Sequence, residues 1–586
     1  MPEFQNPQQD PGMERRLLLV FALTFLVIVL FQPILKKYLP SAPTPPAAAQ
    51  TQTQSPEPTP PAQSSAVNPP VVARPRGAVP KTAVMQAAAE TETILENEQY
   101  RITFTNRGAQ VKSWILKKFD DDHGHPLELV NPATAEKFGH PLSLWTYDEN
   151  LRNQLNSVLY QASGTGALTV PAELTFEYAE HDLDVRKVFR FDQSYMLHIE
   201  TVVTSQGNRV AAYPMWPAGF GDQDAPPGYA SSRIEYQFNS NIERVAFKKI
   251  SSGNTLPGPF NWMAVTDQYF AATFIPDEIQ SVAAVTLHNS LDIPKDPGKP
   301  NQEITKVDVL GVAVGNPKGV TVERLYVGPK ELRVLETVSV PTIIDKDQDL
   351  RGLINFGFFG VIARPLFIWL RWTYTYVRNW GWAIVIQTLI INLVLLPLRI
   401  SSMKSALKMQ KIQPQMNAIK EKYKKYGMRD PRRQEMNTEI GELMKEQGVS
   451  PVGGCLPMLI QMPFLFAYYG MLGAALDLRH AHWLWIKDLS SADPYLILPI
   501  LIIVTGLLTQ RMTPQAGMDP SQQKMMNVVM PVMFGFISYR LAAGLCLYWC
   551  ESSLIAIVQQ MVMNKTSLGR EMREMALKRA RKKEKK

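Results

Sequence analysis

The sequence predicts a polytopic α-helical membrane protein of six spans that carries a large all-β sandwich domain on its outer side. Apolar residues gather near the start of the chain and again beyond Phe356, in runs close to the length that crosses a bilayer. Between these regions, short runs of alternating apolar and polar residues are separated by Gly, Pro, Asn and Asp, which is typical of antiparallel strands. The mean hydropathy of −0.12 hides this division because it averages over both parts.

The N-terminal region predicts a membrane anchor followed by a tether. Residues 1–14 are expected to be cytoplasmic, and residues 15–37 form a signal-anchor span in which Arg15 and Arg16 precede an apolar run. No small-residue cleavage site follows the run, although a cleaved signal peptide is an alternative. Residues 38–90 are rich in Pro, Ala, Thr and Gln, so they predict a disordered linker without a core.

Residues 91–345 predict the β-sandwich domain, which is long enough to build its own core. Its aromatic-rich middle could line a ligand groove, but aromatic residues of a sandwich more often belong to the core: Tyr213, Trp216, Phe220 and Tyr229. His123 and His125 lie in an Asp-Gly-Pro loop without further metal ligands nearby, which favours solvated loop histidines.

The C-terminal part predicts an interfacial helix and five spans. Residues 350–378 mix apolar and aromatic residues with arginines and a central proline, which suits an amphipathic helix lying in the membrane interface. The predicted spans are 381–398, 454–472, 495–510, 525–540 and 541–563. Alternation from a cytoplasmic N-terminus places the β domain and the loop 473–494 outside, and the basic tail 564–586 inside. The outer loop has few basic residues, in agreement with the positive-inside rule.

Residues 399–450 predict a cytoplasmic helical hairpin. Twelve Lys and Arg stand against six acids, and Asp430 followed by Pro431 suits the start of the second helix. Apolar residues recur at steps of three and four along the first helix: Met409, Ile412, Met416, Ile419 and Tyr423. Such a hairpin is too long for an ordinary connection between two spans, so we expect it to have a function of its own. An element that lies on the lipid surface is equally compatible with the pattern.

Polar residues interrupt the spans and predict either a hydrated groove or helix–helix hydrogen bonding. The candidates for a hydrophilic groove are Gln387, Thr388, Asn392, Gln461, Thr505, Tyr548, Glu551 and Ser552. Helix–helix bonding accounts well for Gln461 and Thr505, but Glu551 is ionisable and needs a partner, water or a proton.

The sequence predicts no catalytic residues, metal site or cofactor. The three cysteines lie in or beside apolar segments, so no disulfide frame or thiol chemistry is implied. The basic tail suits anionic lipids or ribosomal RNA phosphates without base specificity, or it is only a topology signal: Lys578, Arg579, Arg581, Lys582 and Lys583.

Several motifs resemble those of the YidC-type membrane protein insertases of the Oxa superfamily, in their Gram-negative form with a large periplasmic domain. These motifs are Asn379-Trp380-Gly381, Leu396-Pro397-Leu398, Gln413-Pro414, the run from Pro451 to Pro457 with Gln461-Met462-Pro463, and the run from Gly544 to Trp549. The resemblance implies a five-span core in the bacterial inner membrane, around a groove open to cytoplasm and lipid. It further implies insertion of nascent membrane proteins, alone or with the Sec translocon, without enzymatic activity. By analogy the hairpin receives the nascent segment and the basic tail contacts the ribosome.

One position departs from the family pattern. The family usually has an arginine five residues before the Pro-Leu that ends the second span, and here Asn392 occupies that position. Arg399 and Arg540 are expected at the wrong depths, so we expect the groove to work by hydration and hydrogen bonding without a fixed positive charge.

Two other function classes stay open from the residues alone. A proton-coupled secondary transporter would use Glu551 with Asn392 as a midplane site. The large charged hairpin and the absence of a detectable inverted repeat argue against it. A purely structural assembly factor would use the β domain to recruit partners.

Overall fold

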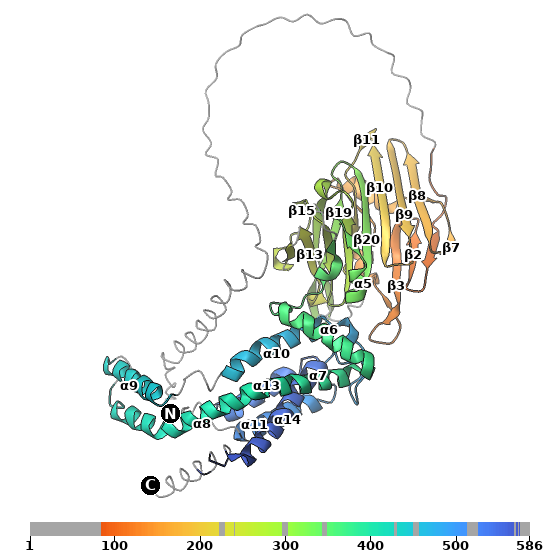
Figure 1. Ribbon diagram of the computed structural model, residues 1–586. Coiled ribbons are helices and arrows are strands. Elements are labelled where there is room, and N and C mark those ends of the chain that lie inside the picture. The colour runs from red at the N-terminus through yellow and green to blue at the C-terminus, as the bar shows by residue number, and fades with distance from the viewer. Residues whose placement is uncertain are drawn as a thin grey trace, which may run out of the picture. The chain divides into compact units, whose positions relative to one another are not determined.

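The structure is a computed structural model of the whole chain (Figure 1). It describes residues 84–221, 229–238, 241–245, 247–295, 303–342, 348–426, 430–448, 456–512 and 525–567, together with 570, 571 and 574. The predicted signal-anchor, most of the predicted linker and the basic residues from 575 onward lie outside these residues. Contacts divide the chain into one unit of Met1–Val79 with Pro414–Gln447, and another of Pro80–Gln413 with Gly448–Lys586. Each unit is described by itself.

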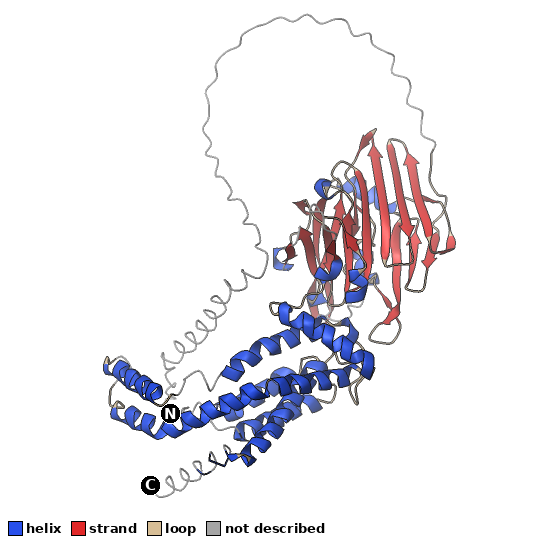
Figure 2. Cartoon of the chain, in the orientation of Figure 1, coloured by secondary structure: helices blue, strands red, loops and turns tan. Residues whose placement is uncertain are grey.

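Three sheets make up most of the β-rich domain (Figure 2). The first runs in the order β4 (Pro126–Glu128), β3 (Gln110–Asp120), β2 (Tyr100–Thr105), β1 (Glu92–Glu96) and β7 (Gly166–Thr169). The second runs β14 (Asn241–Val245), β13 (Arg233–Phe238), β16 (Trp262–Thr266), β17 (Phe270–Pro276), β20 (Val320–Pro329), β10 (Met196–Ser205), β9 (Leu183–Phe191), β8 (Ala172–Glu180) and β6 (Gln161–Ala162), with β11 (Asn208–Arg209) beside β10. The third runs β15 (Asn254–Pro257), β18 (Ala283–Pro294), β19 (Ile304–Gly315), β12 (Tyr213–Trp216) and β5 (Leu144–Trp145).

The domain is β-rich, as predicted, but it differs from a sandwich of two large antiparallel sheets. β1 pairs in parallel with β7, and β21 (Ser339–Val340) pairs with β22 (Gln348–Asp349) as a separate ribbon. The domain also contains the helices α2 (Pro132–Phe138), α3 (Glu149–Ser157) and α5 (Leu332–Glu336), and the short 3₁₀ turns η1 (Phe247–Lys249) and η2 (Ile279–Ser281). Two of these helices begin at side-chain caps that strand alternation does not reveal: Asn131 accepts from the Thr134 amide, and Asp148 from the amides of Asn150 and Leu151.

The aromatic residues of the domain belong to its core. Four of them are candidates for a ligand groove. Of these, Trp216 and Phe220 are fully buried, and their ring centroids lie 5.5 Å apart. Tyr213 and Tyr229 are buried as well. These aromatic residues are therefore part of the core, where burial of their large apolar surface is favourable.

A fully buried lysine ties three chain segments of the domain together. The Lys187 ammonium on β9 donates to the carbonyl oxygens of Gly108 at 3.2 Å, Ala109 at 2.5 Å and Leu142 at 2.7 Å. All three acceptor residues have positive φ, which is strained for Ala109 and Leu142 but not for Gly108. Burial lowers the pKa of Lys187 to about 7, while the three acceptors favour its charged form.

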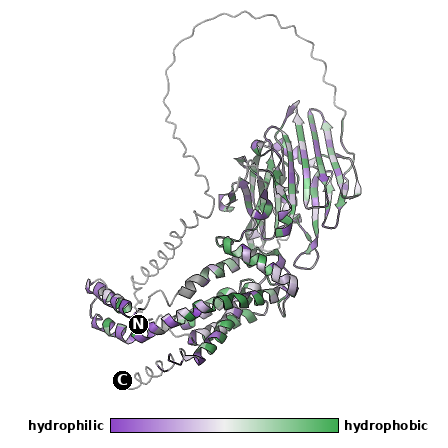
Figure 3. Cartoon of the chain, in the orientation of Figure 1, coloured by the Kyte–Doolittle hydropathy of each residue, from purple (hydrophilic) through white to green (hydrophobic). Residues whose placement is uncertain are grey.

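The helical part begins at η3 (Leu350–Leu353) and α6 (Gly360–Val377). It continues with α7 (Trp380–Val394), α8 (Leu396–Lys422), α9 (Arg432–Glu446), α10 (Leu456–Ala474), η4 (Leu476–Leu478), α11 (Ile497–Met512), η5 (Met525–Val529), α13 (Met530–Ser538) and α14 (Ala543–Lys565). Among the contacting helix pairs are α6 with α7 and α10, α14 with α7 and α11, and α11 with α13. Figure 3 shows that α9 and the far part of α8 are largely hydrophilic, whereas α7 and α13 are largely hydrophobic.

Among the described residues, one helix is by itself long and apolar enough to cross a membrane, Ala543–Lys565. The pair of α7 and α8 passes the same test together, with a bend of 47° at its break. The helices Ile497–Met512 and Met525–Ser538 are apolar but shorter. The six predicted spans thus stay a prediction. The predicted interfacial helix 350–378 is shorter than expected, because its first residues form η3 and an extended segment before α6.

We predict that Lys187→Met lowers the free energy of unfolding of the β domain by about 3 kcal/mol, because it leaves three inward carbonyls without a donor. Thermal unfolding of the full chain in detergent, followed by the β-sheet circular dichroism signal, measures the change. Lys112→Met is the matched control, since Lys112 is exposed and pairs only with Glu92. Equal stability of the two variants would show that the buried ammonium contributes nothing.

Candidate functional site

A groove of about 450 Å³ lies among the helices α7, α8, α10, α11, α13 and α14. Its polar lining residues are Asn392, Arg399, Ser402, Gln461, Gln510, Tyr548, Ser552, Gln559 and Gln560. Its apolar lining residues are Leu395, Leu398, Met403, Met462, Leu465, Phe534 and Trp549. Four of the eight sequence-predicted groove residues line it: Asn392, Gln461, Tyr548 and Ser552. The other four, Gln387, Thr388, Thr505 and Glu551, do not.

Asn392 joins α7 to α14 at the wall of the groove. Its side-chain Nδ2 donates to the Thr388 carbonyl oxygen at 2.9 Å and to the Ser552 hydroxyl at 3.4 Å. An amide has two N–H donors, and both point here to groups on the two helices that flank the groove. The amide therefore holds the wall together while it presents a polar surface to the cavity.

Arg399 lines the same groove as Asn392. Its guanidinium donates to Gln559 Oε1 at 2.7 Å, and Gln559 Nε2 donates to the Asn392 carbonyl oxygen at 3.3 Å. Arg399 follows Asn392 by seven positions, and the two residues lie on the same side of the groove in spite of the 47° bend between α7 and α8. The groove wall thus carries a positive charge about two turns beyond Asn392, and the depth of Arg399 in a membrane stays a prediction.

Gln387 and Thr388 lie behind the groove in a buried polar layer. Tyr468 on α10 donates its hydroxyl to Gln387 Oε1 at 2.6 Å, and Gln387 Nε2 donates to the Leu366 carbonyl oxygen on α6 at 2.9 Å. The Tyr468 and Tyr548 rings stack with centroids 4.1 Å apart. Gln387 therefore serves helix–helix bonding among α6, α7 and α10.

Thr505 and Glu551 have different surroundings. The Thr505 hydroxyl is buried and donates to the Leu501 carbonyl oxygen of its own helix at 2.6 Å, as a packed threonine in a span does. Glu551 interacts with Thr388, and its Oε2 atom is buried without a hydrogen bond to any described residue. Glu551 thus faces the layer behind the groove and not the cavity itself.

The first hairpin helix, α8, shows the predicted stripe as its less exposed face. Ile412, Met416 and Tyr423 are buried, and Met409 and Ile419 are half-buried. In the unit that contains Pro414–Gln447, Lys422 pairs with Glu439 of α9 at 3.2 Å, and the Arg432 guanidinium lies 3.9 Å from the Tyr426 ring centre. The stripe is therefore covered in this structure and not presented to solvent.

The predicted ribosome- and lipid-binding residues of the tail, from Lys578 to Lys583, lie outside the described residues. Shortly before them, Glu571 pairs with Lys411 of α8 at 2.5 Å. No group of His, Cys, Asp and Glu able to hold a metal ion occurs in the part of the chain that the structure describes.

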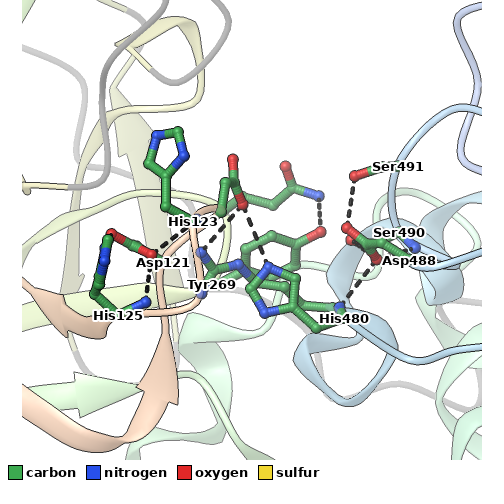
Figure 4. A network of polar contacts seen from close by, with 11 residues as sticks. Asp121, His123, His125, Tyr269, His480, Asp488, Ser490 and Ser491 are labelled. Carbon is green, nitrogen blue, oxygen red and sulfur yellow. Dashed lines mark hydrogen bonds and ion pairs between the residues drawn. The ribbon is translucent and has the colours of Figure 1, made fainter. Parts of the chain in front are cut away.

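Polar contacts join the β domain to the loop between α10 and α11 (Figure 4). Asp122, at the tip of the β3–β4 turn, lies 3.6 Å from the Arg479 guanidinium and 3.3 Å from His480 Nε2. Within the loop, Asp488 accepts from the His480 amide at 3.0 Å and from the Ser491 hydroxyl at 2.6 Å.

The predicted loop histidines lie at the same β3–β4 turn. The Asp121 carboxylate accepts from the amides of His123 and His125, each at 2.8 Å, and the His125 ring is largely exposed. These backbone bonds with the turn aspartate lower the pKa of the Asp121 carboxyl. The aspartate therefore shapes the turn that carries Asp122 to the outer loop.

Sequence reasoning missed Arg399, Gln559 and Gln560 as groove residues. Gln559 and Gln560 follow Ser552 by seven and eight positions, which places them on the same face of α14 about two turns further on. That helical spacing was the available signal, because polar residues repeated on one face of a span mark a wet or packed interface.

Comparisons with known proteins cover both parts of the chain. The family model described as 60Kd inner membrane protein matches residues 372–570, and the model described as YidC periplasmic domain matches residues 93–369. The chain is 31% identical over 570 residues to the membrane protein insertase YidC of Geobacter metallireducens, covering 94% of this chain and 99% of that protein. It is 32% identical to the corresponding protein of Geobacter sulfurreducens, covering 80% and 85%. A crystal structure of an active YidC insertase aligns over 83% of this chain and 95% of that one, with 19% identity and a TM-score of 0.33.

We predict that Tyr468→Phe destabilises the helical part by about 1 kcal/mol, because it removes the donor to the buried Gln387 amide. Thermal unfolding of the full chain in detergent, followed by intrinsic fluorescence, measures the shift. Tyr469→Phe is the control. Tyr469 is the next residue in the sequence, is 55% exposed, and has no comparable acceptor for its hydroxyl among the described residues. The layer is not held by this bond if both variants unfold at the wild-type temperature.

Proposed function

The chain belongs to the YidC family of membrane protein insertases and has the inner-membrane location and periplasmic domain of that family, and we propose that its groove accommodates the polar segment of an incoming membrane protein. The observation that carries this proposal is the joint wall of Asn392, Arg399 and Gln559, which places hydrogen-bonding groups and a charge beside the apolar faces of the helices.

The groove lowers the cost of moving a polar segment into the membrane. An unpaired polar group in hydrocarbon costs about 2–7 kcal/mol, and a wall of amides and a guanidinium offers replacement hydrogen bonds. Transfer of the following apolar segment into lipid is favourable by about 25 cal/mol for each Å² removed from water. No nucleotide or cofactor is needed for this exchange.

We propose that Arg399 supplies the positive charge that the family pattern places at the position of Asn392. A guanidinium held by Gln559 still has further N–H donors directed into the groove. It would therefore attract substrates whose translocated segment is acidic. This revises the expectation of a groove without a fixed charge.

We propose that α7, α10, α11, α13 with η5, and α14 are the five spans of the core, joined by the N-terminal anchor as a sixth. α10 has 19 residues, which at about 1.5 Å each reach the thickness of a bilayer core. α11 and α13 are shorter, so local thinning of the bilayer would accommodate them.

We propose that the hairpin and the tail form the cytoplasmic surface that first binds the nascent chain and its ribosome. Because Met416 and Tyr423 are buried, the hairpin must open before its apolar stripe can bind a nascent segment. The basic tail would contact the ribosome or anionic lipids, and the protein would work alone or beside the Sec translocon. Family membership and charge support these partner assignments.

The transporter alternative has no comparable support. The relatives named above are insertases, and Glu551 faces the layer behind the groove instead of the cavity.

We predict that Arg399→Gln reduces insertion of a single-span substrate with an acidic outer segment about fivefold, the factor that about 1 kcal/mol of lost attraction produces. Insertion is measured as protease protection in liposomes that contain only the purified protein, without nucleotide or an ion gradient. Lys404→Gln, an exposed change on the same helix outside the groove, is the control. The charge proposal fails if acidic and neutral outer segments are affected equally.

We predict that Asn392→Leu reduces insertion of substrates with polar outer segments severalfold, because it removes the donor that joins the wall and makes the cavity apolar. Asn392→Arg should restore insertion of acidic segments. The same liposome assay applies, with Leu393→Ala as a control at an exposed neighbouring position. Normal insertion by the leucine variant would show that polarity at this position is irrelevant.

A further inference from the structure

A second cavity, of about 640 Å³, lies where the β domain meets the outer ends of the helices. Its walls come from β13, the β16–β17 turn, the end of β20, the segment before α6, α10, and the α13–α14 junction. The groove described above lies on the other side of the Tyr468 layer, so the two cavities share no lining residue. The volume is in the range of sites that bind small molecules.

The upper wall of the cavity is polar, and its buried charged groups contact other groups of the protein. Glu235 is 1% exposed and its carboxylate lies 3.0 Å from the Arg244 guanidinium. The Lys330 ammonium donates to the Asp267 carbonyl oxygen at 2.7 Å, and the Asp267 carboxylate accepts from the amides of Tyr269 and Phe270. These groups hold the wall in place and leave little capacity for a ligand.

Two arginines on the rim lack an acidic partner. Arg233 on β13 is exposed and forms no ion pair with any described residue. Among the described residues, Arg540 at the α13–α14 junction donates to the neighbouring Tyr539 hydroxyl at 3.2 Å and has no acidic partner. Because a guanidinium matches the geometry of a phosphate, two such groups on one cavity favour a phosphate-bearing ligand.

The lower wall is apolar and open. Phe359 and Phe466 stack with ring centroids 5.9 Å apart, and Phe358 is 75% exposed beside them. Gly473 on α10 has nothing within 4 Å of the position that a Cβ would occupy. An amphiphile with an anionic head and a hydrocarbon tail fits a cavity with cations at its rim and aromatic rings below.

We propose that this cavity holds a phospholipid of the outer leaflet, with its phosphate between Arg233 and Arg540 and an acyl chain along Phe358 and Phe466. The family assignment places the β domain in the periplasm, so the cavity lies at the outer surface of the membrane. There a lipid phosphate is at the level of the two arginines and hydrocarbon is at the level of the rings. The bound lipid fills the space between the domain and the helices.

The cavity occupant is measured by native mass spectrometry of the full chain released from detergent micelles that contain one defined phospholipid. The variants are Arg233→Gln with Arg540→Gln, which removes both charges, and Gly473→Leu, which fills the cavity with a side chain. Gly473→Leu also raises helix propensity, so it should fold. The control is Arg101→Gln with Arg190→Gln, two exposed arginines that lie elsewhere on the β domain.

We expect the double arginine variant to bind the retained lipid about tenfold more weakly, a change of about 1.4 kcal/mol, and Gly473→Leu to lose it. The control should retain lipid as the wild type does. Retention by both cavity variants overturns the proposal. Displacement of the lipid by millimolar inorganic phosphate or glycerol phosphate overturns it too, because the site is then one for a free anion. A co-purified peptide in place of lipid also overturns it. If one of the two cavity variants unfolds in detergent, the other still tests the proposal, because it changes a different wall of the cavity.

Discussion

The polar part of the groove depends on Gln559 of α14, which bonds to Arg399 and to the Asn392 carbonyl on the two sides of the bend between α7 and α8. Pro397 has no backbone N–H, so the hydrogen-bond ladder of a straight helix cannot continue through it. Arg399 follows Asn392 by seven positions, which is close to two helical turns, and Gln559 of α14 accepts from its guanidinium.

The bonds of Gln559 explain how a charge is tolerated beside hydrocarbon. Gln559 joins two otherwise separate groups, because its oxygen accepts from Arg399 and its nitrogen donates to the Asn392 carbonyl. Each group of this hydrogen-bonded network has a partner. That is the condition for a polar network of low free-energy cost in a medium of low dielectric constant. Glu551 is the exception, since one of its oxygens is buried without a partner in the described part of the chain.

The sequence predicted the family, the β-rich domain and four of the sixteen residues that line the groove, and it missed several other features. Asn392 and Ser552 were found because polar residues inside apolar runs stand out without any geometry. Arg399 was not counted among the groove residues because it follows the Pro-Leu that ends the predicted span. Lys187 was overlooked although it shares the inward period of Val185 and Phe189 on β9, because a lysine is almost never fully buried unless its ammonium is paired. The helices α2 and α3 were missed because caps such as Asn131 act on single positions within a region of alternation.

The layer between the two cavities explains how one bundle can have a cavity near each end and be closed in the middle. On α10, Gln461, Met462 and Leu465 line the groove, whereas Phe466, Tyr469, Gly470 and Leu472 to Ala474 line the outer cavity. On α14, Leu545 lines the outer cavity and Tyr548 lines the groove. Tyr468 and Tyr548 stack at this level, and Gln387 bonds the stack to α7 and α6. Aromatic rings exclude water better than a single aliphatic side chain, and the buried amide fixes their position through directional bonds. The hydrogen bonds of this layer join α6, α7 and α10, and its ring stack joins α10 to α14.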